Sequence, residues 1–171
     1  GNLNVLAGQS PDGEIEIIDI AKAPHMLVAG TTGSGKTIFL QSVLVSLLQQ
    51  YGSDELELLI IDPKQTDFIY FEGLKNLYGG KVVIDAEEAL KMLEKINNED
   101  KEQRTAALRS CRSRDIESYN AQNPNNKMKR LVVVIDEFAD LIQATEMNGQ
   151  RKQFESSLLQ LLQRVRNLGI H

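Results

Sequence analysis

The sequence predicts an α/β protein in which helices cover both faces of a mostly parallel central sheet. Along its 171 residues, short apolar runs typical of strands alternate with longer segments typical of helices. One apolar run leads into a glycine-rich loop and then a helix, and another ends in two adjacent acidic residues. Ligands of open α/β sheets bind at the carboxyl ends of the strands, so both features point to one site at that edge.

Three elements are predicted in the first third of the chain. Residues 14–19 begin with an alternating pattern after a Ser-Pro-Asp-Gly turn and are interpreted as an edge strand near the glycine-rich loop. Residues 25–29 are a short apolar run suited to a buried parallel strand. Residues 38–48 are apolar on most faces, which favours a helix packed inside the fold.

The alternation continues to the end of the chain. A strand over residues 56–61 is ended by the Asp-Pro pair that follows it, because proline cannot donate to the ladder. Asp85 and Glu88 have the spacing of a capping box and predict the start of a helix. The other predicted elements are a strand at 81–84, a helix from 86 towards 96 or on to 109, a short helix near 116–119, a loop at 120–129, a strand at 131–135 and a helix over 150–168 with Gly169 after it.

Residues 30–37, Gly-Thr-Thr-Gly-Ser-Gly-Lys-Thr, fit the phosphate-binding pattern G-x-x-x-x-G-K-[ST]. Glycines allow successive backbone N–H groups to turn inward around a phosphate chain, and the following helix points its positive end at the anion. Lys36 can reach the β- and γ-phosphates, and the Thr37 hydroxyl can bind Mg²⁺. The predicted nucleotide-binding residues are Gly30, Thr31, Thr32, Gly33, Ser34, Gly35, Lys36, Thr37 and Ile38.

Hydrolysis of a bound nucleotide needs a carboxylate near Mg²⁺ and a group that activates water. The apolar run 132–135 is followed by Asp136 and Glu137, which places both groups at the carboxyl end of a strand. We assign Asp136 to the Mg²⁺ shell and Glu137 to the attacking water. Asp62 follows a similar apolar run but precedes Pro-Lys, so it ranks second, as a neighbour of the site. The adjacent acids favour water as the phosphoryl acceptor, which leaves a small-molecule kinase as an outside alternative.

Bulk composition limits the functional classes. The net charge of −5 and a pI near 5.1 argue against binding of nucleic acid over the whole surface, although a local basic loop stays compatible. Cys111 is the single cysteine, which excludes an intramolecular disulfide and a cysteine-based zinc site and fits a reducing, cytoplasmic setting. No apolar run approaches the ~20 residues of a membrane span, and no signal peptide is visible.

Five further parts of the sequence are informative together: residues 23–37, residues 60–64 together with 70–74, residues 116–120, residues 133–141 and residues 164–171. They resemble blocks of the FtsK/SpoIIIE family of DNA translocases. The first and the fourth are similar to the family's Walker A and Walker B regions, and the last resembles the end of a family helix. The blocks occur in the family's order and cover nearly the whole chain.

The resemblance implies a RecA-like P-loop ATPase motor domain that binds ATP and Mg²⁺. Such a motor acts as a homo-oligomer, a hexamer, on double-stranded DNA. The resemblance gives Lys36, Thr37, Asp136 and Glu137 the roles already assigned to them.

The resemblance also implies that an arginine near a subunit boundary completes a neighbour's site, with Arg164 and Arg166 as the candidates. In the family, a strand that ends in a nucleotide-sensing segment follows Gly-Ile-His, whereas this sequence ends at His171. We therefore expect one domain over residues 1–171 that lacks this strand and the C-terminal parts of the motor. The intact parent is expected to be cytoplasmic, with attachment to the inner face of the cell membrane compatible with the sequence.

Two other functions share the same motor fold. ATPases of type VII secretion or conjugation pumps usually carry membrane segments or tandem ATPase domains, and neither is seen in this sequence. An ATPase module of a DNA defence or restriction complex is the second alternative, which neighbouring domains or genes would distinguish.

Overall fold

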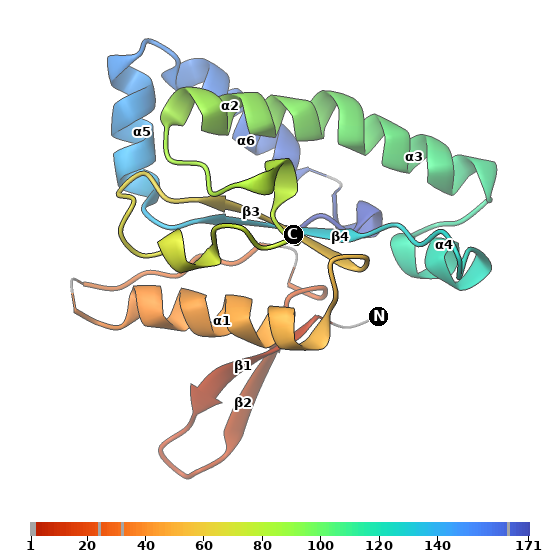
Figure 1. Ribbon diagram of the computed structural model, residues 1–171, viewed down its shortest axis with the longest axis horizontal. Helices are drawn as coiled ribbons and strands as arrows, with labels where there is room; N and C mark the ends of the chain where they lie inside the picture. The colour runs from red at the N-terminus through yellow and green to blue at the C-terminus, as the bar shows by residue number, and fades with distance from the viewer. Residues whose placement is uncertain (1–2, 24, 32, 164) are drawn as a thin grey trace.

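The computed structural model describes residues 3–23, 25–31, 33–163 and 165–171, and it is built around a small parallel sheet (Figure 1). Strands β3 (Leu56–Ile61) and β4 (Arg130–Ile135) pair in parallel without a register shift. Both are mostly apolar, with Glu57 and Arg130 near their starts, as expected for strands that are covered on both faces. Single bridges widen the sheet: Val83 lies beside Ile61, and Ile170 lies beside Leu131. The α/β class is confirmed, and the strand expected at 81–84 is reduced to one of these bridges.

Helices cover both faces of the sheet (Figure 1). Alternate residues of β3 point to opposite sides: Leu58 and Ile60 pack in the cluster that includes α1, and Leu59 and Ile61 pack in the cluster that includes α2 and α6. The helices are α1 (Lys36–Gln50) on one face, and α2 (Ala86–Lys95), α3 (Lys101–Ser110), α5 (Phe138–Met147) and α6 (Arg151–Leu162) on the other, with α4 (Ile116–Gln122) before β4.

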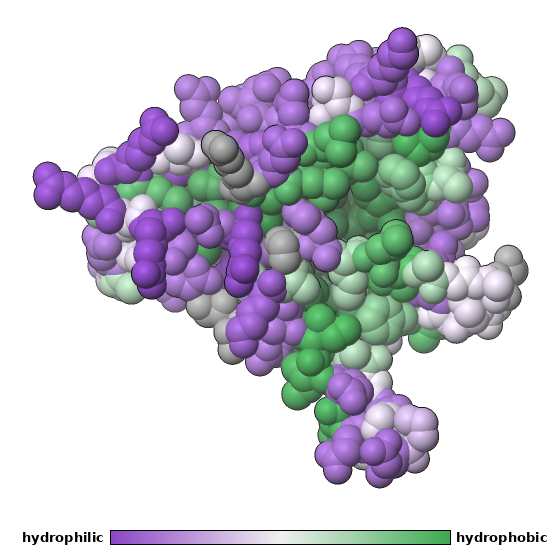
Figure 2. Space-filling view, turned by 180° about the vertical axis from the view of Figure 1, so that it is seen from behind, coloured by the Kyte–Doolittle hydropathy of each residue, from purple (hydrophilic) through white to green (hydrophobic). Residues whose placement is uncertain are grey.

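A separate hairpin of β1 (Asn4–Gln9) and β2 (Ile15–Asp19) projects from the body below α1 (Figure 1). Its base is attached to that helix, because the Gln50 side chain donates to the Asn4 carbonyl over 2.9 Å. The strand predicted at residues 14–19 is confirmed as β2, which within the described residues pairs with β1 alone. The Ser-Pro-Asp-Gly turn joins two strands of a hairpin, and β1 was not foreseen. Apolar surface on the hairpin is visible in Figure 2, where exposed side chains include Leu6, Ile15 and Ile17.

The predicted strand at residues 25–29 was wrong. Residues 25–30 belong to no helix and pair with no strand, and Leu27 is 88% exposed. A strand needs a neighbour that completes its ladder of hydrogen bonds. No described segment lies beside these residues as such a neighbour.

The predicted long helix over 150–168 is divided into two pieces. Helix α6 ends at Leu162, and a 3₁₀ helix, η4 (Arg166–Leu168), follows. The break lets the chain turn back to the sheet, where Ile170 and the next residue pair with the start of β4. Gly169 does adopt the left-handed conformation expected after a helix, at φ 71°, but it ends η4. Helix α5 was not anticipated at all.

Helix α2 begins where the sequence predicts it. The Asp85 carboxylate accepts a hydrogen bond from the Glu88 N–H over 2.7 Å. The Glu88 side chain does not complete the capping box, because it pairs with Lys81 at 2.9 Å. From α2 the chain continues through a π turn, η3 (Ile96–Asp100), into α3, which confirms the longer of the two predicted helix lengths. The remaining 3₁₀ helices are η1 (Ile69–Phe71) and η2 (Tyr78–Gly80).

Candidate nucleotide-binding site

The glycine-rich loop leads directly into the start of α1. Gly33 and Gly35 have φ values of 81° and 90°, which side chains with a Cβ rarely adopt. Gly35 is the N-cap of α1, makes no side-chain cap bond, and no acidic residue lies in the first turn. The first N–H groups of a helix have no partner inside the helix, and they carry the positive end of its dipole. The loop therefore offers uncompensated donors to an anion.

Gly30 is required for the tightness of this loop. The Ser34 N–H donates to the Thr31 carbonyl over 3.0 Å, which folds the loop back on itself. A Cβ on Gly30 would overlap Ser34 Oγ and lie 3.2 Å from Ser34 Cβ. A side chain at residue 30 would therefore force the Ser34 side chain to move. Thr32, which is also predicted to bind nucleotide, lies outside the described residues.

The two predicted halves of the site meet through Lys36 and Glu137. Lys36 Nζ donates to Glu137 Oε2 over 3.0 Å, although the residues are 101 positions apart in the sequence. Their side chains are 21% and 27% exposed, so the pair is only partly reached by solvent. The hydrogen bond from Lys36 is the main cause that lowers the pKa of Glu137 below its usual value, and the charge of Lys64 adds to it. The carboxylate is therefore ionised at neutral pH.

Asp136 has the surroundings expected of a residue that binds a cation. Its backbone N–H continues the sheet ladder to the Ile61 carbonyl at 3.1 Å, while its side chain is buried. Oδ1 is buried without a hydrogen-bond partner. Burial raises the pKa of the Asp136 carboxyl, and the charges of Asp62, Asp67 and Glu137 raise it further. A bound cation would pair the free oxygen and offset this cost.

Within the described residues, no cluster of three or more His, Cys, Asp or Glu side chains could hold a metal by itself. This finding is compatible with Mg²⁺ on a nucleotide, which is bound through one or two protein groups together with phosphate and water. Asp136 and the half-buried Thr37 are the residues that fit such an ion.

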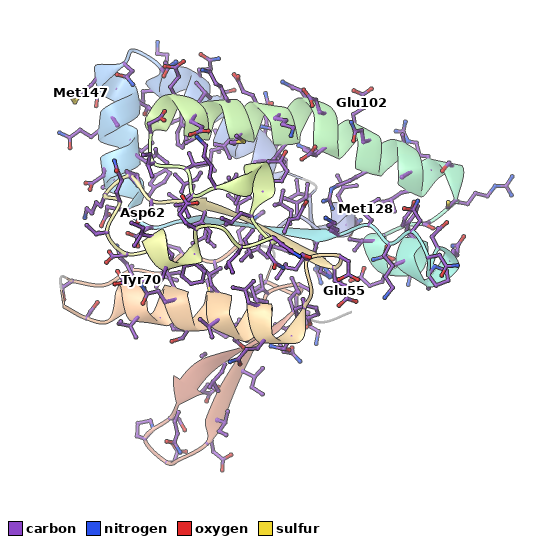
Figure 3. All side chains as sticks on the ribbon, in the orientation of Figure 1. Glu55, Asp62, Tyr70, Glu102, Met128 and Met147 are labelled. Atoms are coloured by element: carbon purple, nitrogen blue, oxygen red, sulfur yellow. The ribbon has the colours of Figure 1, made fainter. Side chains whose placement is uncertain are left out.

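Asp62 has a different role from Asp136. It is fully buried at the end of β3 (Figure 3). Its Oδ1 accepts from the backbone N–H groups of Lys64 and Gln65 at 3.2 and 3.1 Å, and its Oδ2 accepts from those of Asp67 and Phe68, both at 3.2 Å. Because both oxygens are occupied by backbone donors, Asp62 anchors the loop after β3. This arrangement supports the ranking of Asp136 above it as the metal ligand.

The loop after β3 brings Lys64 into the site, which sequence reasoning did not foresee. Lys64 Nζ lies 3.5 Å from Glu137 Oε2 and 3.3 Å from Asp140 Oδ2. Nothing in a single lysine after an Asp-Pro pair indicates contacts with residues about seventy positions away. The spacing of Glu137 and Asp140 on one turn at the start of α5 was the available signal, since side chains three apart on a helix share a face.

Arg166 lies away from this cluster. It belongs to η4, which ends at Gly169. The Gly169 carbonyl accepts a hydrogen bond from the Leu131 N–H, near the start of β4. Glu137 follows the other end of β4, about 16 Å further along at ~3.3 Å per residue. Arg166 is exposed, and its Nε donates to the Ala21 carbonyl over 3.1 Å. The structure does not bring it to Glu137 of the same chain, and Arg164 lies outside the described residues.

Other basic side chains are paired within the chain. Lys127 lies 3.4 Å from Glu55, and Lys129 lies 3.4 Å from Glu57. Arg104 is largely buried and donates to two backbone carbonyls. In the part of the chain that the structure describes, no helix is both long and apolar enough to cross a membrane.

Comparison with known proteins identifies the family of the chain. The FtsK/SpoIIIE family matches residues 1–171. The "DNA translocase FtsK" of Treponema pallidum (strain Nichols) is 35% identical over 172 residues, which cover 98% of this chain and 21% of the relative. The protein of the same name from Helicobacter pylori (strain ATCC 700392 / 26695) is 34% identical over 99% of this chain and 19% of its own length. The chain thus spans about a fifth of the length of these relatives.

Two solved structures are also similar to the chain over nearly its whole length. The pCW3 conjugation coupling protein TcpA, in its monomer form with ATPγS, has a TM-score of 0.81 and 30% identity over 98% of this chain and 46% of that one. The cytoplasmic domain of the Thermomonospora curvata type VII secretion ATPase EccC has a TM-score of 0.79 and 26% identity over 99% of this chain and 20% of that one. With the family match over its whole length, the chain belongs to the FtsK/SpoIIIE family.

Proposed function

We propose that this chain is the ATP-binding part of a motor that couples ATP hydrolysis to the translocation of double-stranded DNA. The contact between Lys36 and Glu137 carries the proposal, because it joins the phosphate-binding loop to the acidic strand end at one site. Relatives named DNA translocase support DNA as the substrate. We infer that the small parallel sheet is part of a RecA-like sheet in the intact protein.

In this proposal, the residues of the loop hold the phosphate chain of ATP. The backbone N–H groups of Lys36, Thr37 and Ile38 at the start of α1 and the ammonium of Lys36 would face the phosphates, and the helix supplies its dipole. Thr37 and Asp136 hold Mg²⁺, which would neutralise part of the phosphate charge. The partnerless Oδ1 of Asp136 supports this assignment.

Glu137 is proposed as the acceptor of the proton from the attacking water. The water oxygen forms a bond to the γ-phosphorus, and the bond from that phosphorus to the β,γ-bridging oxygen breaks, with its electrons leaving on ADP. The proton of the water passes to Glu137, which is ionised because of its neighbouring lysines. Lys36 must turn from Glu137 to the phosphates before this step.

We infer further that the intact protein acts as a homo-oligomer, a hexamer, around DNA. Arg166 is proposed to complete a neighbour's site, and its separation from Glu137 of its own chain supports this role. The net charge of −5 argues against DNA contacts over the whole surface of this chain and favours local ones. Phosphate contacts of this kind weaken steeply as salt rises.

The test measures ATPase activity of the full-length protein with and without linear double-stranded DNA at low salt. We expect stimulation by DNA, loss of turnover in Lys36→Ala, Asp136→Ala and Glu137→Gln, and lower turnover of the assembled oligomer in Arg166→Ala. A rate of ATP turnover that is the same with and without DNA would contradict the proposal of a DNA-translocating motor. A variant Asp136→Ala that spares Mg²⁺-dependent hydrolysis, with Asp62→Ala abolishing it, would reverse the metal assignment.

Conjugation and secretion ATPases form the second candidate class. The similarity to the conjugation coupling protein TcpA, at 30% identity, is the observation that favours it. ATP turnover that rises with a secreted protein and stays constant with DNA would select a protein pump.

A further inference from the structure

We infer that Lys64 is a positioning residue that holds Glu137 in place when Lys36 turns to the phosphates of ATP. The inference rests on the proposed function, because it concerns the same carboxylate. It assigns a task to a side chain outside both the glycine-rich loop and the acidic strand end.

Glu137 is held by two lysines from different elements. Its Oε2 is 3.0 Å from Lys36 Nζ and 3.5 Å from Lys64 Nζ. If Lys36 leaves to bind phosphate, Lys64 is the remaining cation on this oxygen. Lys64 also lies 3.3 Å from Asp140 Oδ2, one helical turn beyond Glu137 in α5. These two contacts hold the Lys64 ammonium between the carboxylates of Glu137, the residue before α5, and Asp140, in the first turn of α5.

The backbone that carries Lys64 is built for this position. Its N–H donates to the buried carboxylate of Asp62. The next residue, Gln65, has φ 58°, a left-handed conformation that is uncommon for any residue other than glycine. Such backbone persists where surrounding contacts impose it, and it gathers at functional sites. The Asp62 carboxylate, with four backbone donors, provides those contacts.

A solvated ion pair with no function is the alternative explanation, since Lys64 is 47% exposed and exposed pairs contribute little to stability. That explanation predicts no effect on turnover. The two explanations therefore differ in what a substitution at Lys64 does to the chemical step.

The test separates nucleotide binding from turnover in the full-length protein. Lys64→Met is expected to lower kcat by about 10- to 100-fold, the range for loss of orientation of a reacting group, while the Kd of a fluorescent ATP analogue changes less than twofold. Lys64→Arg should keep kcat near wild type, and Asp140→Asn should give a smaller loss. Lys91→Met is the matched control, because Lys91 pairs with Glu87 on the surface of α2 and should change neither quantity.

Coupling to Glu137 provides the second measurement. Single-turnover hydrolysis, followed over hours with labelled ATP, should be equally slow in Glu137→Gln and in Glu137→Gln/Lys64→Met. A wild-type kcat in Lys64→Met, an equal loss of nucleotide affinity and kcat, or a further loss in the double variant would overturn the inference. If Glu137→Gln itself keeps full turnover, the proposed role of Glu137 fails instead, which separates the two ideas.

Discussion

Lys36 Nζ and Glu137 Oε2 form a direct hydrogen bond of 3.0 Å, so the cation that the loop provides for phosphate is paired with a carboxylate of the same chain. Binding of ATP is then an exchange, in which phosphate oxygens replace a carboxylate on the same ammonium. The affinity for nucleotide reflects the difference between these two partners.

The exchange predicts that Glu137→Gln tightens ATP binding while it abolishes turnover. Glutamine keeps the shape of the side chain but removes its charge, so Lys36 is released at lower cost. With about 1 kcal/mol assigned to a partly exposed ion pair, the Kd should fall roughly three- to tenfold. Titration with a fluorescent ATP analogue measures this change, and weaker binding would contradict the exchange.

Gly30 offers a test of the loop geometry. Gly30→Ala should weaken ATP binding, because its Cβ meets Ser34 and forces that side chain to move. Loss of one or two charge-assisted hydrogen bonds, at about 1.5–3 kcal/mol each, corresponds to a fall of at least tenfold in affinity. Gly30→Ala/Ser34→Ala removes the worst overlap and should recover part of the affinity, whereas Ser34→Ala alone should bind nearly as well as wild type. No recovery in the double variant would show that the overlap is not the cause.

Asp62 should matter for local structure. Asp62→Ala leaves four backbone N–H groups of the loop after β3 without their acceptor and should cost about 2–4 kcal/mol of stability. Hydrogen exchange followed by mass spectrometry should show residues 64–68 losing protection in the full-length protein. Asp12→Ala, in the exposed turn of the hairpin, is the control. Unchanged protection of the loop would disprove the anchoring role.

Substitution of Asp136 should raise the stability of the protein, whereas substitution of Asp62 should lower it. Burial raises the pKa of its carboxyl, so between its unfolded pKa of about 3.9 and the raised folded pKa, the folded state binds more protons and stability falls as pH rises. Asp136→Asn removes this cost and should raise the unfolding temperature of the nucleotide-free protein at pH 7. The gain should disappear as the pH falls below about 4, where the carboxyl is protonated in both states. Scanning calorimetry at the two pH values measures this, and a destabilised variant at pH 7 would contradict it.

Local patterns in the sequence were sufficient for the elements that carry their own signal. The apolar runs of β3 and β4 predict buried strands, and Asp85 predicts the start of α2. Each of these patterns lies within a few consecutive residues. The glycine-rich loop and Glu137 were also found from sequence, since each has a recognisable spacing.

Features that depend on distant partners could not be predicted in this way. Residues 25–30 have the composition of a strand, but strand pairing requires a neighbour, and the described residues provide none. The end of α6 at Leu162 is set by the return of the chain to β4, a tertiary constraint that overrides the helical pattern. The contact of Lys64 with Glu137 joins two loops across the sheet edge and leaves no periodic trace in the sequence.

Helix α1 connects two remote parts of the molecule as a stiff rod. Its first residue, Lys36, belongs to the phosphate-binding loop, and its last, Gln50, holds the base of the β1–β2 hairpin through the Asn4 carbonyl. At 1.5 Å per residue, the 15 residues span about 22 Å. Because the helix is continuous over this length, it fixes the separation between the phosphate-binding loop and the base of the hairpin.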